Sequence, residues 1–334
     1  MEQIPEGFER VNCPGCAAEQ SQVALIGRDW TLDPQRRIFI VRCDSCGLHF
    51  TNPRPTMERL GAYYSADYAP YQRQRGEIER GSKLSTTIRT WVLADAFGAP
   101  ANKPRGWRRA VVRFVRLFQS SEHFGFGIPY QGEGRLLDFG CGDGTFLRRM
   151  AAIGWQTTGL DFGERAVAAV RASGIPALQG TLPHPQLAAG SFDVITMRHA
   201  LEHVPDPRPV LTAALQLLRP GGRLVIQVPN FASWEIAHFG DAAFSLDLPR
   251  HLLHFTPSTL GDLLKRCGFE IVEIDQRCRA GWLRKSLSRA RQNGCAHRWD
   301  SLLNVKAICA LAANRAQRRG QGNEIIAWAS RPIA

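Results

Sequence analysis

Three glycines at alternate positions form the stretch of this sequence that is best suited to chemistry. Gly140, Gly142 and Gly144 follow the short apolar segment 136–139 and precede the amphipathic run 146–153. Glycines at such a turn adopt backbone angles that are closed to other residues and let the backbone approach a ligand closely. A strand, a glycine-rich turn and a helix in this order bind nucleotide-like ligands in α/β domains. The sequence therefore predicts a ligand-binding turn, the alternative being a turn that holds nothing.

An acidic residue stands where such a ligand would present a ribose. Asp161 ends the next predicted strand, 157–161, and a carboxylate there can accept both ribose hydroxyls. Dinucleotide sites and S-adenosylmethionine sites share this pattern. The dinucleotide fingerprint needs its third glycine one position later, where Thr145 stands. The alternating spacing instead leaves room for the methionine part of a nucleoside sulfonium.

Four of the nine cysteines form two CxxC pairs, Cys13 with Cys16 and Cys43 with Cys46. Two such pairs can place four thiolates around a tetrahedral Zn²⁺, and a site with four cysteine ligands has no open position. We therefore expect a zinc ribbon in which the metal is structural. A redox pair, or two unrelated pairs, are the alternatives.

The elements that must position these residues alternate between strand and helix from residue 135 onward, which predicts a parallel sheet. The expected strands are 136–139, 157–161, 176–179, 191–197, 223–228, 270–274 and 324–329, and the expected helices are 146–153, 165–172, 207–218 and 257–267.

Two segments before this region are harder to interpret. Residues 51–75 are rich in proline and then in tyrosine (Tyr63, Tyr64, Tyr68 and Tyr71), which is typical of a connector that could cover a site. On a helical wheel, 107–118 places Trp107, Ala110, Val111, Phe114, Leu117 and Phe118 on one face, and Arg108, Arg109, Val112, Arg113 and Arg116 on the other. Such a helix can lie in a membrane interface. The preferred interpretation is an ordinary surface helix whose apolar face packs on its own domain.

The net charge of the chain is +12, and residues 277–334 contribute +10 of it through twelve Lys/Arg and two acids. This indicates an acidic partner (phosphates, anionic lipid or nucleic acid) or a solvated basic surface. At 334 residues and 44% hydrophobic content, two packed domains or one with appendages are expected. We expect no signal peptide and no membrane span, and a reduced, cytoplasmic location.

Taken together, these stretches resemble the class I S-adenosylmethionine-dependent methyltransferases. The matching segments are LLDFGCGDGTF (136–146), GLD (159–161), FDVITMRHALEHVPDP (192–207), LLRPGGRLVIQVPN (217–230) and LPRHLLHFTPSTLGDLLKRCGFEIVEI (248–274). The ribbon and the PRHLLHF segment are similar to a bacterial subgroup that modifies sugars, glycans and secondary metabolites. The resemblance implies an α/β, Rossmann-like sheet of seven strands, with an N-terminal zinc ribbon and helical insertions. Its last strand is antiparallel and lies between the fifth and the sixth.

The resemblance also implies four parts of the chain and a cofactor site. The parts are a zinc ribbon (1–56), a tyrosine-rich connector and helical cap (57–134), a methyltransferase domain (135–276 with 323–331) and a basic helical insertion (277–322). Carried onto this sequence, the turn at the methionine moiety is formed by Asp138, Gly140, Gly142 and Gly144. The ribose is bound by Asp161, and the adenine stacks on Phe162 with its edge next to Thr181 and Leu182. The sulfonium faces Met197. Thr181 departs from the pattern, because an acid often contacts the adenine amine there.

Methyl transfer to a hydroxyl needs a base, for which histidine is suited. His199 and His203 follow the fourth predicted strand, and His251 and His254 lie in the loop after the fifth. We select His251 first. For each of the four, a structural role is the alternative.

The expected function is methyl transfer to oxygen or carbon of a small-molecule, sugar or glycan acceptor, which could be lipid-linked and reached by peripheral contact with the inner membrane face. The first alternative is an RNA methyltransferase that grips phosphates with the ribbon and basic tail. An Asn/Asp-Pro-Pro-Tyr/Phe motif is missing after the fourth strand, so nucleic acid is the weaker partner. The second alternative is a non-catalytic ribbon adaptor, which the glycine turn and Asp161 argue against.

Overall fold

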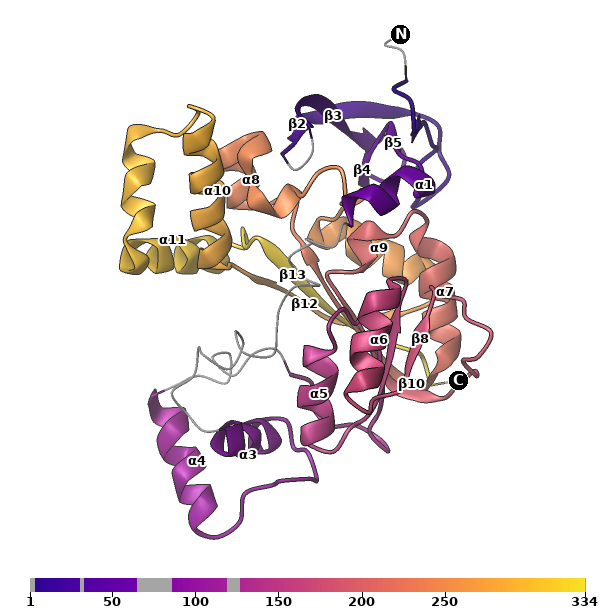
Figure 1. Cartoon of the computed structure of the whole chain (residues 1–334), viewed down its shortest axis with the longest axis vertical. Coiled ribbons are helices and arrows are strands. Elements are labelled where there is room, and N and C mark those ends of the chain that lie inside the picture. Colours follow the sequence, from indigo (N-terminus) through magenta and orange to yellow (C-terminus); the bar gives the residue numbers. More distant parts are fainter. Residues whose placement is uncertain (1–3, 31–32, 65–85, 119–126, 334) are drawn as a thin grey trace. The chain divides into compact units, whose positions relative to one another are not determined.

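The computed structural model describes residues 4–30, 33–64, 86–118 and 127–333 of the chain (Figure 1). Tyr68 and Tyr71 of the predicted connector lie outside these ranges. The chain divides into two compact units, each of which is described by itself below. The first is drawn from Met1–Ser65, Met197–Leu215 and Leu224–Pro332, and the second from Ala66–Thr196, Gln216–Arg223 and Ile333–Ala334.

A seven-stranded mixed sheet runs in the order β12-β13-β10-β9-β6-β7-β8. Strand β6 pairs in parallel with β7, and β7 with β8, whereas β12 and β13 are antiparallel. The last strand of the chain, β13, thus lies between β10 and β12, which are the fifth and sixth strands of this sheet in chain order. This confirms the predicted fold class. The strands are β6 (Arg135–Phe139), β7 (Gln156–Asp161), β8 (Ala177–Gln179), β9 (Phe192–Arg198), β10 (Leu218–Pro229), β12 (Glu270–Arg277) and β13 (Glu324–Ser330).

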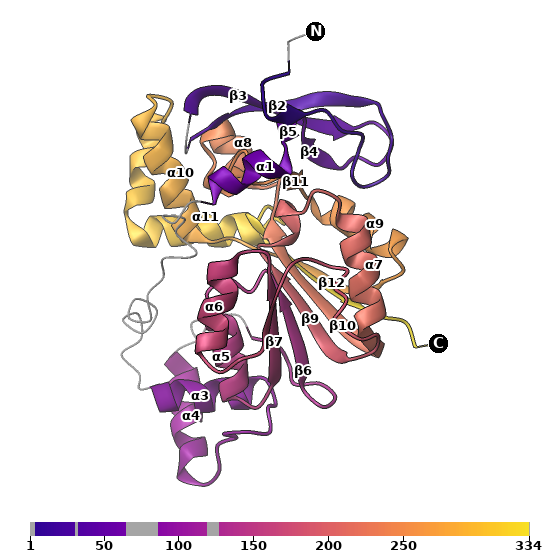
Figure 2. The same cartoon turned by 45° about the vertical axis from the view of Figure 1, so that its right-hand side comes forward.

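Helices accompany the sheet in both units. In the second unit, α5 (Thr145–Ala152) contacts β7, and α6 (Glu164–Ala172) contacts β7 and β8 (Figure 2). In the first unit, α9 (Pro257–Arg266) contacts β12 and β13 and begins with a capping box formed by Thr256 and Thr259. Helix α7 (Pro207–Leu217) ends where predicted. The Pro-Gly-Gly stretch that follows it at 220–222 lies inside β10.

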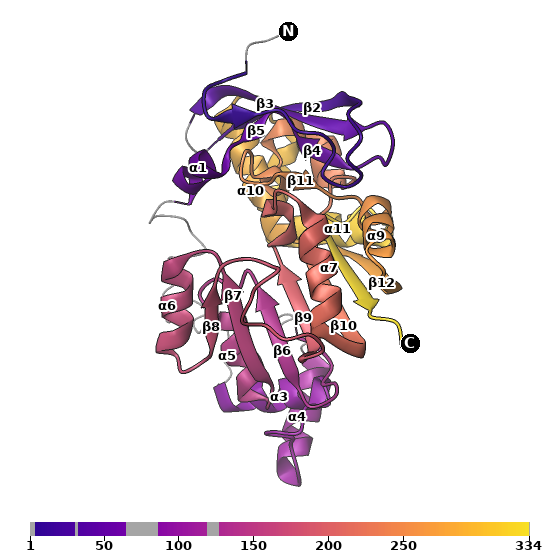
Figure 3. The same ribbon diagram turned by 90° about the vertical axis from the view of Figure 1, so that its right-hand side faces the viewer.

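The cysteine-rich segment forms a four-stranded sheet in the order β11-β4-β3-β2 (Figure 3). Its fourth strand, β11, comes from about two hundred residues further along the chain. Its strands are β2 (Ser21–Asp29), β3 (Asp33–Cys43), β4 (His49–Thr51) and β11 (Leu253–His254). The short strands β1 (Phe8–Glu9) and β5 (Arg54–Pro55) pair with each other in a separate two-stranded sheet. Ile38 and Ile40 of β3 share a buried cluster with Ile236, Leu246 and Leu287. The ribbon is therefore packed into the first unit by apolar burial as well as by strand pairing.

Short helical elements fill the rest of the first unit. They are α1 (Met57–Leu60), η1 (Gly61–Tyr63), η4 (Leu201–His203), α8 (Trp234–Phe239), η5 (Gly240–Ala242), η6 (Phe244–Leu246), α10 (Ala280–Gln292), η7 (Arg298–Asn304) and α11 (Lys306–Arg318). The segment 277–322 is helical, as the sequence predicts. Of the helices that the structure describes, none combines the length and apolar content needed to cross a bilayer.

Two helices of the second unit, α3 (Thr86–Ala96) and α4 (Trp107–Phe118), correct the helical-wheel prediction. Val112, which the wheel places on the basic face, is fully buried, whereas Trp107 is 68% exposed and Phe114 63% exposed. The cause is that arginines of α4 contact α3. The Arg108 guanidinium lies 4.8 Å from the ring centroid of Trp91, and Arg116 pairs with Asp95 at 2.9 Å. The buried position of α4 is thus Val112 rather than the whole aromatic face, although the Trp107 ring of that face also meets Trp91 edge to face, with centroids 5.7 Å apart.

Candidate functional site

The glycine turn carries the chain from β6 into α5 in the second unit. Gly140, Gly142 and Gly144 have φ angles of 73°, 53° and 72°, in the left-handed region that glycine adopts without strain. A Cβ on Gly142 would meet nothing within 4 Å, so the space in front of this residue is open to a ligand. A Cβ on Gly144 would lie 2.8 Å from the side chain of Val170, so glycine there allows close packing with α6.

Asp161 is fixed at this turn by two backbone donors. Its Oδ2 accepts the N–H of Gly142 at 2.9 Å, and its Oδ1 accepts the N–H of Gly163 at 2.9 Å. A carboxylate oxygen has two lone pairs, so a carboxylate oriented in this way is suited to accept the hydroxyls of a ribose. The next residue, Phe162, is half-exposed and offers a ring on which an adenine could stack.

The other residues predicted for the cofactor have different degrees of exposure. Asp138 is buried and accepts the hydroxyl of Thr196 at 2.6 Å, which holds its side chain still. Thr181 is exposed and Leu182 is buried. All of these belong to the second unit together with the glycine turn. Met197 belongs to the first unit and is fully buried, and its contact with the cofactor stays a prediction.

His199 is held between two buried carboxylates in the first unit. Its Nδ1 lies 3.4 Å from Glu202 Oε1, and its Nε2 lies 3.0 Å from Glu324 Oε1. Burial opposes charge on this ring, but the two carboxylates outweigh it and raise the pKa of His199. A ring that is protonated at both nitrogens has no lone pair with which to take a proton. Its φ of +51° is rare for a residue with a side chain, so the backbone is strained at this point.

His203 and His251 present lone pairs instead. Nδ1 of His251 lies 3.1 Å from the carbonyl oxygen of Ser245, and Nδ1 of His203 lies 3.0 Å from that of Arg250. Since a carbonyl only accepts, we infer that each Nδ1 carries a hydrogen, which leaves the lone pair of each neutral ring on Nε2. The two rings meet edge to face, with centroids 4.7 Å apart. Burial and the neighbouring His203 lower the pKa of His251 to about 4, so His251 is neutral near pH 7.

A buried carboxylate accompanies these two rings. Glu202 is fully buried, and His199 Nδ1, 3.4 Å from its Oε1, is the donor group that faces it most closely among the contacts of the described residues. Burial opposes its ionisation, but His199 and the charges of His203 and His251 lower the pKa of Glu202. A buried carboxylate with unfilled acceptor positions is costly unless a ligand or water fills them.

Further polar side chains hold this cluster in place. Asp247 makes a two-point ion pair with the Arg250 guanidinium. Burial opposes the ionisation of Asp247, but this ion pair helps to lower its pKa to about 2. Tyr64 Oη lies 2.9 Å from His203 Nδ1. Sequence reasoning did not select Glu202, Asp247 or Glu324 for this site. The local signals were Glu202 beside His203 and Asp247 four residues before His251, whereas the contact between Glu324 and His199 joins residues that are distant in the chain.

His254 is placed differently from the other three histidines. It is buried, and its Nε2 lies 3.0 Å from the hydroxyl of Thr51 in β4. That hydroxyl donates to the carbonyl of His251, so it accepts a hydrogen from His254. Burial keeps the pKa of His254 well below 6.5. Its ring therefore joins β11 to the ribbon sheet.

Two sets of side chains have the composition of metal sites. The four ribbon cysteines lie close together, with Sγ atoms 3.5 Å apart for Cys13 and Cys46 and 3.6 Å apart for Cys16 and Cys43. A tetrahedral site with Zn–S bonds of about 2.3 Å places its sulfurs about 3.8 Å apart, so this geometry fits zinc. Glu202, His203 and His251 also offer ligand atoms within 4.8 Å of one another, and could hold a divalent cation.

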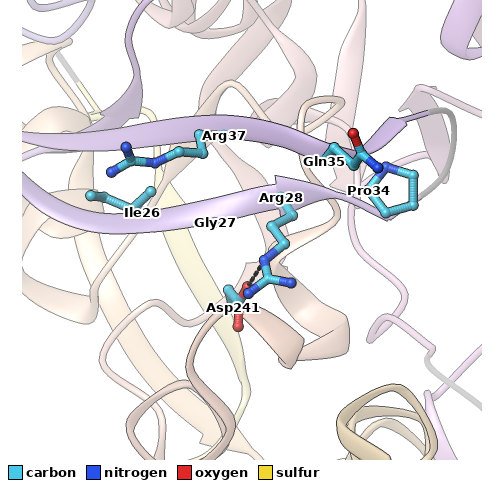
Figure 4. A pocket seen from close by; sticks show the side chains of 7 residues that line it. All are labelled: Ile26, Gly27, Arg28, Pro34, Gln35, Arg37 and Asp241. Carbon is cyan, nitrogen blue, oxygen red and sulfur yellow. Dashed lines mark ion pairs between the residues drawn. The ribbon is translucent and has the colours of Figure 1, made fainter. Parts of the chain in front are cut away.

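A hollow of about 510 Å³ lies elsewhere in the first unit (Figure 4). It is lined by Ile26, Gly27 and Arg28 of β2, by Pro34, Gln35 and Arg37 of β3, and by Asp241. Arg28 points to Asp241 and pairs with it at 3.1 Å (Figure 4). The hollow contains none of the side chains described above, and it offers no base or nucleophile. It therefore does not bear on the chemistry.

We expect the half-buried His49 and the buried His254 to destabilise the fold in acid. Burial and the charge of Arg42 lower the pKa of His49 to about 4, and His254 is also lowered. Between pH 6.5 and 4 the unfolded chain then binds more protons, so the free energy of unfolding falls as the pH falls. The expected loss at pH 5 is on the order of 1–2 kcal/mol per histidine.

Urea unfolding at pH 7.5 and pH 5 checks this expectation. His254→Gln, which can still donate to Thr51 but cannot ionise, should lose less stability between the two pH values than the wild type. His184→Gln, a histidine of the second unit, should behave like the wild type. An equal acid loss in His254→Gln and the wild type would show that His254 does not contribute.

Comparison with known families agrees with the fold and the glycine turn. A family model described as "Methyltransferase domain" matches residues 101–274, just over half of the chain. The chain belongs to this family, and its sheet order agrees with an S-adenosylmethionine-dependent methyltransferase of class I. The non-catalytic adaptor is thereby set aside.

The individual proteins that resemble this chain share about a third or less of their residues with it over the aligned part. The chain is 34% identical over 153 residues to the "Ubiquinone biosynthesis O-methyltransferase" of Aromatoleum aromaticum, covering 42% of this chain and 65% of that protein. It is 31% identical over 170 residues to the protein of the same name from Xanthomonas euvesicatoria pv. vesicatoria, covering 47% and 71%. The chain thus spans slightly less than two thirds of the first of these relatives. A solved S-adenosylmethionine-dependent methyltransferase from Mesorhizobium loti aligns at 22% identity and a TM-score of 0.44, over 61% of this chain and 94% of that one.

Proposed function

We propose that this methyltransferase transfers the methyl group of S-adenosylmethionine to a hydroxyl oxygen of a small organic acceptor. The observation that carries the proposal is the geometry of His203 and His251, whose Nδ1 atoms lie on carbonyl oxygens and whose rings lie beside the buried carboxylate of Glu202. Two relatives are named for O-methylation, which supports oxygen as the methylated atom. When bound, the cofactor supplies an electrophilic methyl group on a sulfonium, and the turn residues Asp138 to Gly144 and Asp161 position it.

His251 is the proposed base. Its Nδ1–H is held by the carbonyl of Ser245, so its ring is oriented with the Nε2 lone pair available to a hydroxyl hydrogen. The proton moves from the acceptor oxygen to Nε2 as that oxygen attacks the methyl carbon. The carboxylate of Glu202, 4.0 Å from this nitrogen, stabilises the imidazolium that forms. His203 is the second candidate for the base. His199 acts indirectly, because it holds the carboxylate of Glu202 in position.

The low basicity of His251 bears on the class of acceptor. A base with a pKa of about 4 takes a proton more readily from an acidic hydroxyl than from a weakly acidic one. A phenol, with a pKa of about 10, is several units more acidic than an alcohol. We therefore favour a phenolic hydroxyl over a sugar or glycan hydroxyl, which remains the second acceptor class.

The experiment is a transfer assay with methyl-labelled S-adenosylmethionine and matched panels of phenols, sugars and RNA. We expect label in the phenols, and a loss of kcat of about 10²–10⁴-fold in His251→Ala, with cofactor affinity unchanged because His251 does not belong to the glycine turn. His184→Ala is the control. Label in RNA alone would instead support the RNA methyltransferase.

The same assay distinguishes a base from a metal site. If Glu202, His203 and His251 hold a divalent cation, activity should fall on chelation and return with one added metal while the ribbon stays folded. Full activity after chelation supports the base. Wild-type kcat in both His251→Ala and His203→Ala would reject both versions of the site.

A further inference from the structure

An apolar row runs along η7 and α11 in the first unit, and α11 is drawn in gold in Figure 1. Its members follow one another at intervals of three residues, so neighbouring side chains lie side by side on the helical surface. Each is between 37% and 68% exposed. The members of this apolar row are Leu302, Val305, Ile308 and Leu311.

The inner side of α11 carries small residues instead. Cys309, Ala313 and Ala316 are the buried residues of this helix, and the first two pack in a cluster with Leu283 of α10. A surface helix of a folded domain ordinarily turns its large aliphatic side chains inward and its polar ones outward. Here the large aliphatic side chains face out, so the row adds little to the core. A contiguous exposed apolar surface of this kind marks an interaction site.

The charges around the apolar row have one sign. The sequence 277–322 contains eleven Lys/Arg and one acid, Asp300. Asp300 is buried, and it lies 2.8 Å from His238, so it does not offset the positive surface. Lys306, Arg315 and Arg318 are exposed on the same helix as the row.

We propose that this surface docks the enzyme on a membrane that contains anionic phospholipid. Aliphatic side chains rimmed by Lys and Arg can insert at the boundary of headgroups and acyl chains while the cations meet phosphates. A second copy of this chain fits less well, because two strongly basic surfaces would repel each other. Nucleic acid fits less well too, since the four side chains of the row are aliphatic and offer no flat ring on which a base could stack. The proposal is independent of which acceptor is methylated.

Co-sedimentation of the full chain, with zinc supplied, tests this docking. The probes are vesicles of equal parts phosphatidylglycerol and phosphatidylcholine, and vesicles of phosphatidylcholine alone. We expect binding to the mixed vesicles that weakens with salt, and little binding to phosphatidylcholine. Leu311→Asp should lower the partition coefficient by about tenfold or more, since one leucine side chain would no longer leave water. Arg315→Glu combined with Arg318→Glu should lower it and flatten its salt dependence.

A matched control separates docking from folding. Val272→Asp alters an exposed valine of β12, outside the row, and should bind vesicles like the wild type. Leu311→Asp should keep the wild-type unfolding temperature, because Leu311 is exposed. Binding that Leu311→Asp leaves unchanged would overturn the proposal. The proposal would also be overturned if the wild type did not bind vesicles at all. This holds both for a protein that stays monomeric and for one that forms a dimer that Leu311→Asp dissociates.

Discussion

Replacing Asp161 by alanine is expected to weaken the binding of S-adenosylmethionine by about 100-fold or more. The carboxylate would contribute two charge-assisted hydrogen bonds to the ribose, each worth about 1.5–3 kcal/mol. It also fixes the turn through the N–H of Gly142, so its removal loosens the backbone against which the methionine part would lie. Calorimetric titration with S-adenosylmethionine measures the change.

Two further variants make this result specific. Asp161→Asn keeps the size and one acceptor oxygen, and should lie between alanine and the wild type. Asp262→Ala, at an exposed acid of α9, should bind like the wild type. Affinity that is unchanged in Asp161→Ala would mean that the ribose contact is misassigned, even though the chain is a methyltransferase.

Loss of the ribbon metal is the second large effect that we expect. We propose that Cys13, Cys16, Cys43 and Cys46 bind one zinc ion per chain, and a structural zinc can supply about 10 kcal/mol of folding free energy in a small domain. Cys43→Ser should therefore lose zinc and lower the unfolding temperature of the first unit. Because β4 pairs with β11, and because Thr51 holds His254, the loss should extend to the segment that contains His251.

Metal analysis and limited proteolysis measure the two parts of this expectation. The wild type should contain one zinc ion, and Cys43→Ser should be cleaved within residues 240–256 as well as in the ribbon. Cys295→Ser changes an exposed cysteine outside the cluster and should retain both the metal and the resistance to protease. A full complement of zinc in Cys43→Ser would contradict the ligand assignment.

The sheet and the cofactor turn were predictable because their signals are local. Continuous apolar strands, alternating glycines and Asp161 at a strand end can each be recognised within a few residues. The packing of α4 could not be predicted this way. Its orientation depends on Arg108 meeting Trp91 and on Arg116 meeting Asp95, which are contacts between two helices and cannot be read from the periodicity of one.

The four histidines show the same limit for the candidate site. Their positions in loops after strands were visible in the sequence, but their protonation was not. The pKa of His199 is raised, against the effect of burial, because Glu202 and Glu324 meet at its ring, whereas burial lowers the pKa of His251. Glu324 lies more than a hundred residues from His199, so the difference arises only when the chain folds.

The pairing of β11 with β4 also limits how this enzyme can be rebuilt. A chimaera that exchanges only residues 4–56 with those of a relative would bring in a new edge strand and a new residue at position 51. Leu253 and His254 of β11 would then have to pair with a foreign β4, and His254 would lose Thr51 as its hydrogen-bond partner. The unit of exchange is the ribbon together with residues 249–256. Acceptor preference and the metal-bound module would therefore be inherited together, although two hundred residues separate them in the gene.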